Sequence, residues 1–221
     1  MSKRITAAVT AVVVALTGIA ATSQAQATPK PVNGETVVVK RLKGKVLVKH
    51  SRNGKTHQLR GAETLKLKSL ILDTRRGQVK LTAMGRKGDG LQTARIWGSR
   101  FNATQYRNRT VVRLGLIHDI DYSKCDTWGP QGVAETLWVD ARGRFGTSGS
   151  AGGYASSDSA KWFTRDRCYT TRYQVQRGEV KVEDSTSYVE DPLLKRGDGY
   201  TAFSEPCRPT VRRCSQAPIR G

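Results

Sequence analysis

The sequence predicts an all-β protein, folded as a single curled β-sandwich or solenoid-like domain of many short strands. Apolar and polar residues alternate over short runs, which Gly, Asn, Asp and Ser separate, as is typical of strands joined by tight turns. After the N-terminus, no convincing run carries apolar residues at positions i, i+3, i+4 and i+7, so we expect no amphipathic helix. A Gly-x-Val-x-Val motif occurs at residues 44–48 and 178–182, and residues 77–81 repeat its first part. We therefore expect a domain built from Gly-x-Val-x-Val repeats.

The expected strands follow one another along the chain with short turns between them. Asn53-Gly54 is a hairpin signal after the strand that begins at Gly44. The segment 69–84 predicts two strands, one on either side of Arg75-Arg76-Gly77, and residues 119–132 predict a long loop. The other strands are expected within residues 35–42, 44–50, 51–59, 91–106, 109–117, 135–140, 143–149, 160–165, 170–182 and 193–203.

Alternation assigns the side chains of these strands to two faces of the sheet. In the strand after Gly44, Val46 and Val48 should face the core, and Lys45 and Lys49 should face solvent. Three tryptophans within strand patterns, Trp97, Trp138 and Trp162, are expected in the core, whereas Trp128 in the long loop is expected to be exposed.

The N-terminus has the layout of a secretory signal peptide. Lys3 and Arg4 precede an apolar stretch at residues 5–22, and Ala25-Gln26-Ala27 is a small-x-small cleavage site. A retained anchor is the alternative, because this stretch could barely span a hydrocarbon core of ~30 Å. We expect cleavage near Ala27, a secreted, extracytoplasmic protein, and no later transmembrane segment. The expected organisation is a signal peptide at 1–27, a flexible leader at 28–34, the all-β domain at 35–205 and a disulfide-closed tail at 206–221.

The basic charge is concentrated in the first half of the chain. The net charge is +20, of which Lys3 and Arg4 would leave with the signal peptide. Residues 28–118 contain 21 Lys and Arg against four acidic residues, whereas residues 119–221 contain 15 against 14. A field of this sign attracts polyanions and is sensitive to salt. We therefore expect a polyanion-binding surface formed by Lys40, Arg41, Lys43, Lys45, Lys49, Arg52, Lys55, Arg75, Arg76, Arg107, Arg109 and Arg113.

An exported protein with this charge would meet anionic envelope polymers, acidic lipids and extracellular DNA. Only a few aromatic residues, Trp97, Phe101 and Tyr106, lie among the basic ones, so base stacking on nucleic acid has weak support and any such binding would be unspecific. A protein partner is a further possibility, and so is a basic surface that only keeps the protein soluble.

The sequence offers weak candidates for catalysis. Cys168 follows Arg165 and Arg167, and neighbouring cations can activate a thiol, but no motif supplies it with a histidine base. A group formed by His118, Asp119, Asp121 and Asp126 matches no zinc or calcium signature. No Gly-x-Ser-x-Gly elbow occurs, and no pair of carboxylates stands out. We expect no catalytic centre, no metal and no cofactor.

Two sets of residues resemble the FecR-like domain family, in particular exported actinobacterial proteins with this domain. The likeness covers roughly residues 37–202 and consists mainly of glycines and apolar residues. The resemblance implies a curled, all-β recognition module outside the cell, but this chain lacks the cytoplasmic segment and membrane span with which family members relay a signal. The first set is Gly44, Val46, Val48, Leu59, Leu70, Asp73, Thr74, Gly77, Val79, Leu81 and Thr82; the second is Phe145, Thr147, Gly149, Trp162, Thr164, Asp166, Cys168, Val175, Gly178, Val180, Val182, Gly197 and Tyr200.

The expected function is noncatalytic recognition at the cell envelope, through contact with anionic polymers or a protein partner. A secreted enzyme acting on nucleic acid or a wall polymer is the alternative. A purely structural or protein-binding module is the third possibility, and it should be insensitive to salt. The oligomeric state does not follow from the sequence.

The four cysteines, an even number in an exported chain, predict two disulfides. Cys207 and Cys214 are close in sequence, which favours their pairing and leaves Cys125 for Cys168. The Cys125–Cys168 bond would close a loop of roughly 44 residues and contribute about 4 kcal/mol to the free energy of unfolding. Mass analysis of unreduced proteolytic peptides should detect both bonds. A free thiol at Cys168 in the folded, exported protein would contradict this pairing.

Overall fold

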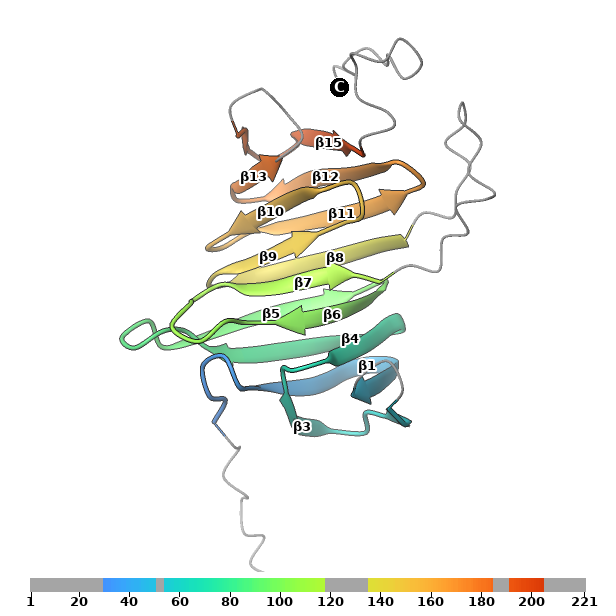
Figure 1. The fold of residues 1–221 in the computed structure, drawn as a ribbon, viewed down its shortest axis with the longest axis vertical. Helices are drawn as coiled ribbons and strands as arrows, with labels where there is room; N and C mark the ends of the chain where they lie inside the picture. The colour runs from blue at the N-terminus through green and yellow to red at the C-terminus, as the bar shows by residue number, and fades with distance from the viewer. Residues whose placement is uncertain (1–29, 51–53, 118–134, 185–190, 205–221) are drawn as a thin grey trace, which may run out of the picture.

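A computed structural model describes residues 30–50, 54–117, 135–184 and 191–204. Within these ranges there is no helix, and the strands form one nearly closed, barrel-like sheet (Figure 1). The all-β prediction is therefore confirmed. The described ranges accordingly contain no helix that could cross a membrane. The predictions for the signal peptide, for Arg52, for the acidic group at 118–126, for Trp128 and for the tail 206–221 lie outside the described residues.

The described residues form fifteen strands, most of them short. They are β1 (Thr36–His50), β2 (Thr56–Gln58), β3 (Ala62–Lys66), β4 (Leu70–Met84), β5 (Leu91–Trp97), β6 (Arg100–Thr104), β7 (Val112–Leu116), β8 (Glu135–Arg142), β9 (Phe145–Ser148), β10 (Gly153–Ser157), β11 (Lys161–Arg167), β12 (Thr170–Arg177), β13 (Val180–Asp184), β14 (Leu193–Leu194) and β15 (Gly199–Phe203).

Two runs of strands diverge from β4. The first half of β4 pairs with β6, and that run continues through β7, β9, β10, β13 and β14. The second half pairs with β5, and that run continues through β8, β11, β12 and β15. Figure 1 shows the first run in front of the second. All these pairings are antiparallel except the parallel one between β7 and β9. At the far end, the hydroxyl of Tyr200 in β15 donates to Asp184 in β13 at 2.8 Å and links the two runs.

Strands β1 and β4 bend together where Gly44 lies opposite Gly77. The backbones approach so closely that a Cβ at Gly44 would collide with the carbonyl oxygen of Arg76, and one at Gly77 would lie 2.6 Å from the carbonyl oxygen of Lys45. Gly44 also has a φ of +67°, which other residues adopt at a cost. Each strand therefore passes through its bend unbroken, whereas the sequence predicts a break at each of these positions.

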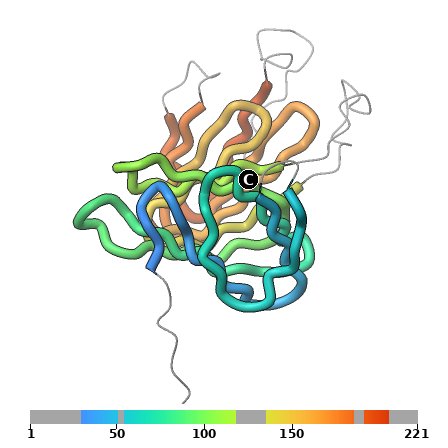
Figure 2. Tube along the Cα trace, turned by 60° about the horizontal axis from the view of Figure 1, so that its bottom comes forward, coloured from blue at the N-terminus to red at the C-terminus, as the bar shows by residue number. Residues whose placement is uncertain are grey.

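The other edge of β1 pairs with β3 along its first half and with β2 along its second half. Figure 2 brings this N-terminal end of the sheet forward. The β1–β2 pairing is the hairpin expected at Asn53-Gly54, and it stacks the rings of His50 and His57 with their centroids 6.5 Å apart. His57 also contacts Glu63, with Nε2 2.9 Å from the carboxylate. The two stacked histidines are therefore linked to β3 through the carboxylate of Glu63.

The core lies between the two runs of strands. Val46 and Val48 are fully buried while Lys45 is exposed, as the alternation predicts. Trp162 is also fully buried, which confirms the prediction for this tryptophan. Its indole NH donates to Thr147 Oγ1 at 2.9 Å, so β11 and β9 are joined across the core. The buried polar atom of the indole is thereby satisfied.

A second buried contact joins the runs at Asp166, which is fully buried. Its carboxylate accepts hydrogen bonds from the backbone NH of Ser150 at 2.9 Å and from the hydroxyl of Thr171 at 2.6 Å. The same hydroxyl accepts a bond from the backbone NH of Ala151. Asp166 and Thr171 therefore hold the turn between β9 and β10.

Substitution of Gly44 by Ala tests the importance of the bend. We expect Gly44→Ala to lower the free energy of unfolding by about 2–4 kcal/mol, because the new Cβ adds backbone strain and a collision with β4. Urea denaturation would measure the loss. Gly61→Ala is the control: a Cβ there meets nothing within 4 Å, so its effect should stay below about 0.5 kcal/mol. Equal effects of the two changes would contradict the role of the bend.

Candidate functional site

Five basic side chains and one carboxylate form a row across six strands. Hydrogen-bonded register places Lys40 opposite Lys80, and Lys80 opposite Arg95. From Arg95 the register continues through β8, β11 and β12. We call this set the cation row; its members are Lys40, Lys80, Arg95, Asp140, Lys161 and Arg177.

The cation row carries uncompensated positive charge. Its one acid, Asp140, pairs with Arg177 at 2.7 Å. Among the described residues, no carboxylate lies within ion-pair distance of Lys40, Lys80 or Arg95, and these three side chains are exposed. Like charges directly opposite each other destabilise a sheet. The stability of the fold therefore does not account for this row.

An aromatic row runs beside the cation row, two residues away from it on each central strand. It consists of Trp97 in β5, Trp138 in β8 and Phe163 in β11, which are opposite one another in register. The two indole rings are parallel, with centroids 5.8 Å apart, and Phe163 meets Trp138 edge-on at 5.0 Å. Trp97 and Trp138 are partly exposed. The prediction that they belong to the core is therefore wrong, because their strands turn these positions to the outer face.

Cations border the aromatic row on both sides. On one side, Lys161 Nζ lies 5.8 Å from the ring centroids of both Trp97 and Trp138. On the other, the guanidinium of Arg165 lies 5.0 Å from the ring of Phe163, and the register places Arg172 opposite Arg165. We call the cation row, the aromatic row, Arg165 and Arg172 together the outer face. It combines positive charge with accessible aromatic surface.

The polyanion-binding residues predicted from the sequence do not form one surface. Of that set, only Lys40 lies in the cation row, with Lys43 next to the aromatic row through its pairing with Gln78. Lys45 and Arg76 are opposite each other at the bend. Arg41 donates to the carbonyl oxygens of Gly44 and Arg60, and Arg75 pairs with Asp73. Lys49 and Lys55 belong to the β1–β2 hairpin region. Arg107 and Arg109 lie in the turn between β6 and β7.

The sequence does not single out several basic residues of the outer face. Lys161, Arg165, Arg172 and Arg177 come from the second half of the chain, where basic and acidic residues nearly balance. A signal was present in the alternation of "KWFTRDR", which places Lys161, Phe163 and Arg165 on one side of β11. Charge counted by halves of the chain conceals it, because among the described acids of that half only Asp140 lies in the cation row.

The alternation of β11 also separates the charges around Cys168. Arg165 lies on the outer face, whereas Asp166 is buried and Cys168 is only 6% exposed. Adjacent residues of a strand point to opposite faces, so Arg165 does not reach the sulfur across the sheet. The three other cysteines lie outside the described residues, and the two disulfide pairings remain a prediction.

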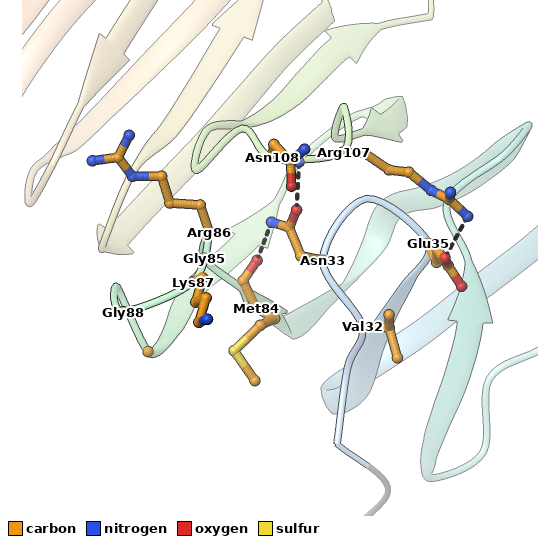
Figure 3. A pocket seen from close by; sticks show the side chains of 11 residues that line it. Val32, Asn33, Glu35, Met84, Gly85, Arg86, Lys87, Gly88, Arg107 and Asn108 are labelled. Atoms are coloured by element: carbon orange, nitrogen blue, oxygen red, sulfur yellow. Dashed lines mark hydrogen bonds and ion pairs between the residues drawn. The ribbon is translucent and has the colours of Figure 1, made fainter.

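A cavity of about 700 Å³ lies at the N-terminal end of β1. Asn33 is one of the residues that line this cavity. Its amide donates to the carbonyl oxygens of Met84 and Arg109, and its Oδ1 accepts from the backbone NH of Asn108. These bonds tie residues 32–34 to the sheet, in contrast to the flexible leader expected at 28–34. In Figure 3 the cationic side chains at this cavity, Arg86, Lys87 and Arg107, point in different directions.

This cavity is a weaker anion site than the outer face. Arg107 is paired with Glu35 at 2.6 Å, and Arg86 lies 3.5 Å from Asp89. Two of its three cations are thus already compensated. Among the described residues, no group of three His, Cys, Asp or Glu side chains could hold a metal ion.

Comparison of the chain with protein-family models, curated proteins and solved structures finds no match.

Arg113, one of the predicted polyanion-binding residues, lies on the opposite run of strands. Its guanidinium lies 4.8 Å from the ring centroid of Tyr154 in β10. Burial raises the pKa of Tyr154 from 10.0 to about 12, although the charge of Arg113 acts in the opposite direction. Arg113 is therefore engaged with a half-buried tyrosine rather than with the cation row.

The raised pKa of Tyr154 predicts a loss of stability in alkali. The unfolded chain releases this proton near pH 10 and the folded chain near pH 12, so stability falls as the pH rises between these values. We expect Tyr154→Phe to remove about 2 kcal/mol of this alkaline loss, as measured by urea denaturation at pH 8 and pH 11.5. Tyr106→Phe is the control, because Tyr106 is 67% exposed. The same alkaline loss in wild type and Tyr154→Phe would contradict this assignment.

Proposed function

We propose that this protein is an exported, noncatalytic binding module of FecR-like type that holds anionic polymers on its outer face. The observation that carries the proposal is the cation row, five basic side chains with a single acid across six neighbouring strands. Strand spacing of about 4.8 Å places successive charges close together. A linear polyanion lying across the strands could contact several of them at once.

Two further features support a polymer as the ligand. The charges lie on the outside of a sheet rather than in a closed cavity, so a chain of any length can pass over them. The bordering side chains of Trp97 and Trp138 offer apolar surface beside the charges. A small anion would use neither the length of the row nor the aromatic surface.

Binding to linear inorganic polyphosphate tests the proposal, with affinity measured from 50 to 300 mM salt. We expect the logarithm of the association constant to fall linearly with the logarithm of the salt concentration, because bound phosphates release counterions. The polymer should keep its length after long incubation. An affinity that does not change with salt concentration would favour a protein partner instead. Shortening of the polymer by the pure protein would favour the enzyme alternative.

The triple variant Lys80→Gln/Arg95→Gln/Lys161→Gln locates the binding site. We expect it to weaken polyphosphate binding by at least about tenfold at low salt, and to reduce the salt slope by about 2, since each lost contact removes about 0.7. The matched control is Lys68→Gln/Lys87→Gln/Lys195→Gln, which removes the same charge at exposed positions in turns. Equal losses in the two variants would show that net charge alone attracts the polymer, and would overturn the assignment to the outer face.

A further inference from the structure

We propose that the polymer bound by the outer face is single-stranded nucleic acid, held by base stacking on the aromatic row and by phosphate contacts with the cation row. This inference rests on the proposed function and adds the chemical class of the ligand. Its basis is the parallel course of the two rows. A polyanion without rings would use only one of them.

The spacing of the rows suits a nucleotide. Residues two apart on a strand lie on the order of 7 Å apart, so an aromatic ring and its neighbouring cation are separated by about the size of one nucleotide unit. Trp97 lies two residues from Arg95. Trp138 lies two residues from the acid Asp140, but Lys161 Nζ lies 5.8 Å from the ring centroids of both indoles. A base over the aromatic row would therefore bring its phosphate near the cation row.

Within the aromatic row, Trp97 and Trp138 provide the ring surface that stacking requires, whereas Phe163 is only 7% exposed. The indoles of Trp97 and Trp138 are parallel within 1° and partly exposed. Stacking of bases on such side chains tolerates any sequence, because every base has a π-face. Arg165 and Arg172 add guanidinium planes on the far side of the row, and bases also stack on these groups.

The shape of the outer face favours a single strand over a duplex. Reading of duplex DNA requires a helix or a narrow two-stranded ribbon that enters the major groove. The aromatic row instead lies on the central strands β5, β8 and β11 of a continuous sheet. In a duplex the faces of the bases are covered by their neighbours, so the aromatic row would have no partner. Acidic polysaccharides carry charges and rings but have no π-face for the guanidinium groups.

A competition among four polyanions tests the inference. The probes are a 15-nucleotide oligo(dT), an oligo(dA)·oligo(dT) duplex, linear polyphosphate and dextran sulfate, compared at equal charge concentration. We expect oligo(dT) to bind at least about tenfold more tightly than polyphosphate, since stacking adds to the charge contacts. Oligo(dT) should also quench the tryptophan fluorescence of the wild-type protein, whereas polyphosphate should not. The fluorescence comparison requires no variant.

Substitution of Trp97 separates stacking from charge. We expect Trp97→Ala to weaken oligo(dT) binding by roughly 5- to 100-fold, and to change polyphosphate binding by less than about twofold. Trp97→Phe keeps an aromatic ring and should restore most of the affinity. Lys68→Gln is a control away from the outer face. Urea denaturation of each variant shows whether it is folded. If Trp97→Ala is unfolded, the fluorescence experiment on the wild-type protein still tests the inference.

The outcomes distinguish failure of this inference from failure of the proposed function. If none of the four polyanions binds, both fail. If polyphosphate binds as tightly as oligo(dT) and Trp97→Ala affects neither, the face binds polyanions by charge alone and the inference is wrong. Preference for dextran sulfate that depends on Trp97 would identify an acidic polysaccharide, and equal binding of the duplex would exclude base stacking. Each of these results overturns the assignment to single-stranded nucleic acid.

Discussion

The close approach of β1 and β4 at Gly44 and Gly77 is the constraint on which the rest of the structure depends. At this point a side chain on either residue would meet the backbone of the other strand. Because both strands bend here without a break, one end of β4 pairs with β6 and the other with β5. A single strand thereby starts both runs of the barrel, and the core forms between them.

The bend also determines where the outer face lies. Beyond Gly77, the register of β4 with β1 and β5 brings Lys40, Lys80 and Arg95 into line. The apolar residues on either side of Lys80, Val79 and Leu81, are fully buried. They stabilise the sheet by removing apolar surface from water. That burial offsets the repulsion among the cations. Charge on the outside and packing on the inside are thus two consequences of one alternating pattern.

Buried polar contacts complete the barrel at the other end. Asp166 holds the β9–β10 turn, and Thr147 satisfies the indole of Trp162. Both contacts connect strands from different runs, so they maintain the relative position of the two layers. They also explain the cluster of charges that precedes Cys168: Asp166 is part of the interior, and Arg165 is part of the outer face. Two adjacent positions of β11 thus serve two different purposes.

The sequence by itself determined the all-β class, the buried face of the strands at Val46 and Val48, and the β1–β2 hairpin, because each depends on local alternation or turn chemistry. It also indicated the positive charge that any polyanion site requires. Only the tertiary structure decided that Trp97, Trp138 and Phe163 are neighbours on the outside, and that Lys161 and Arg177 join Lys40 in one row. The physical reason is that alternation divides a strand into two faces but does not specify which face is buried when both carry large apolar side chains, as around Trp138, and it does not specify which strands pair. Residues as far apart in the sequence as Lys40 and Arg177 join one row only when β1, β4, β5, β8, β11 and β12 pair in that order, and the candidate site exists only once they have done so.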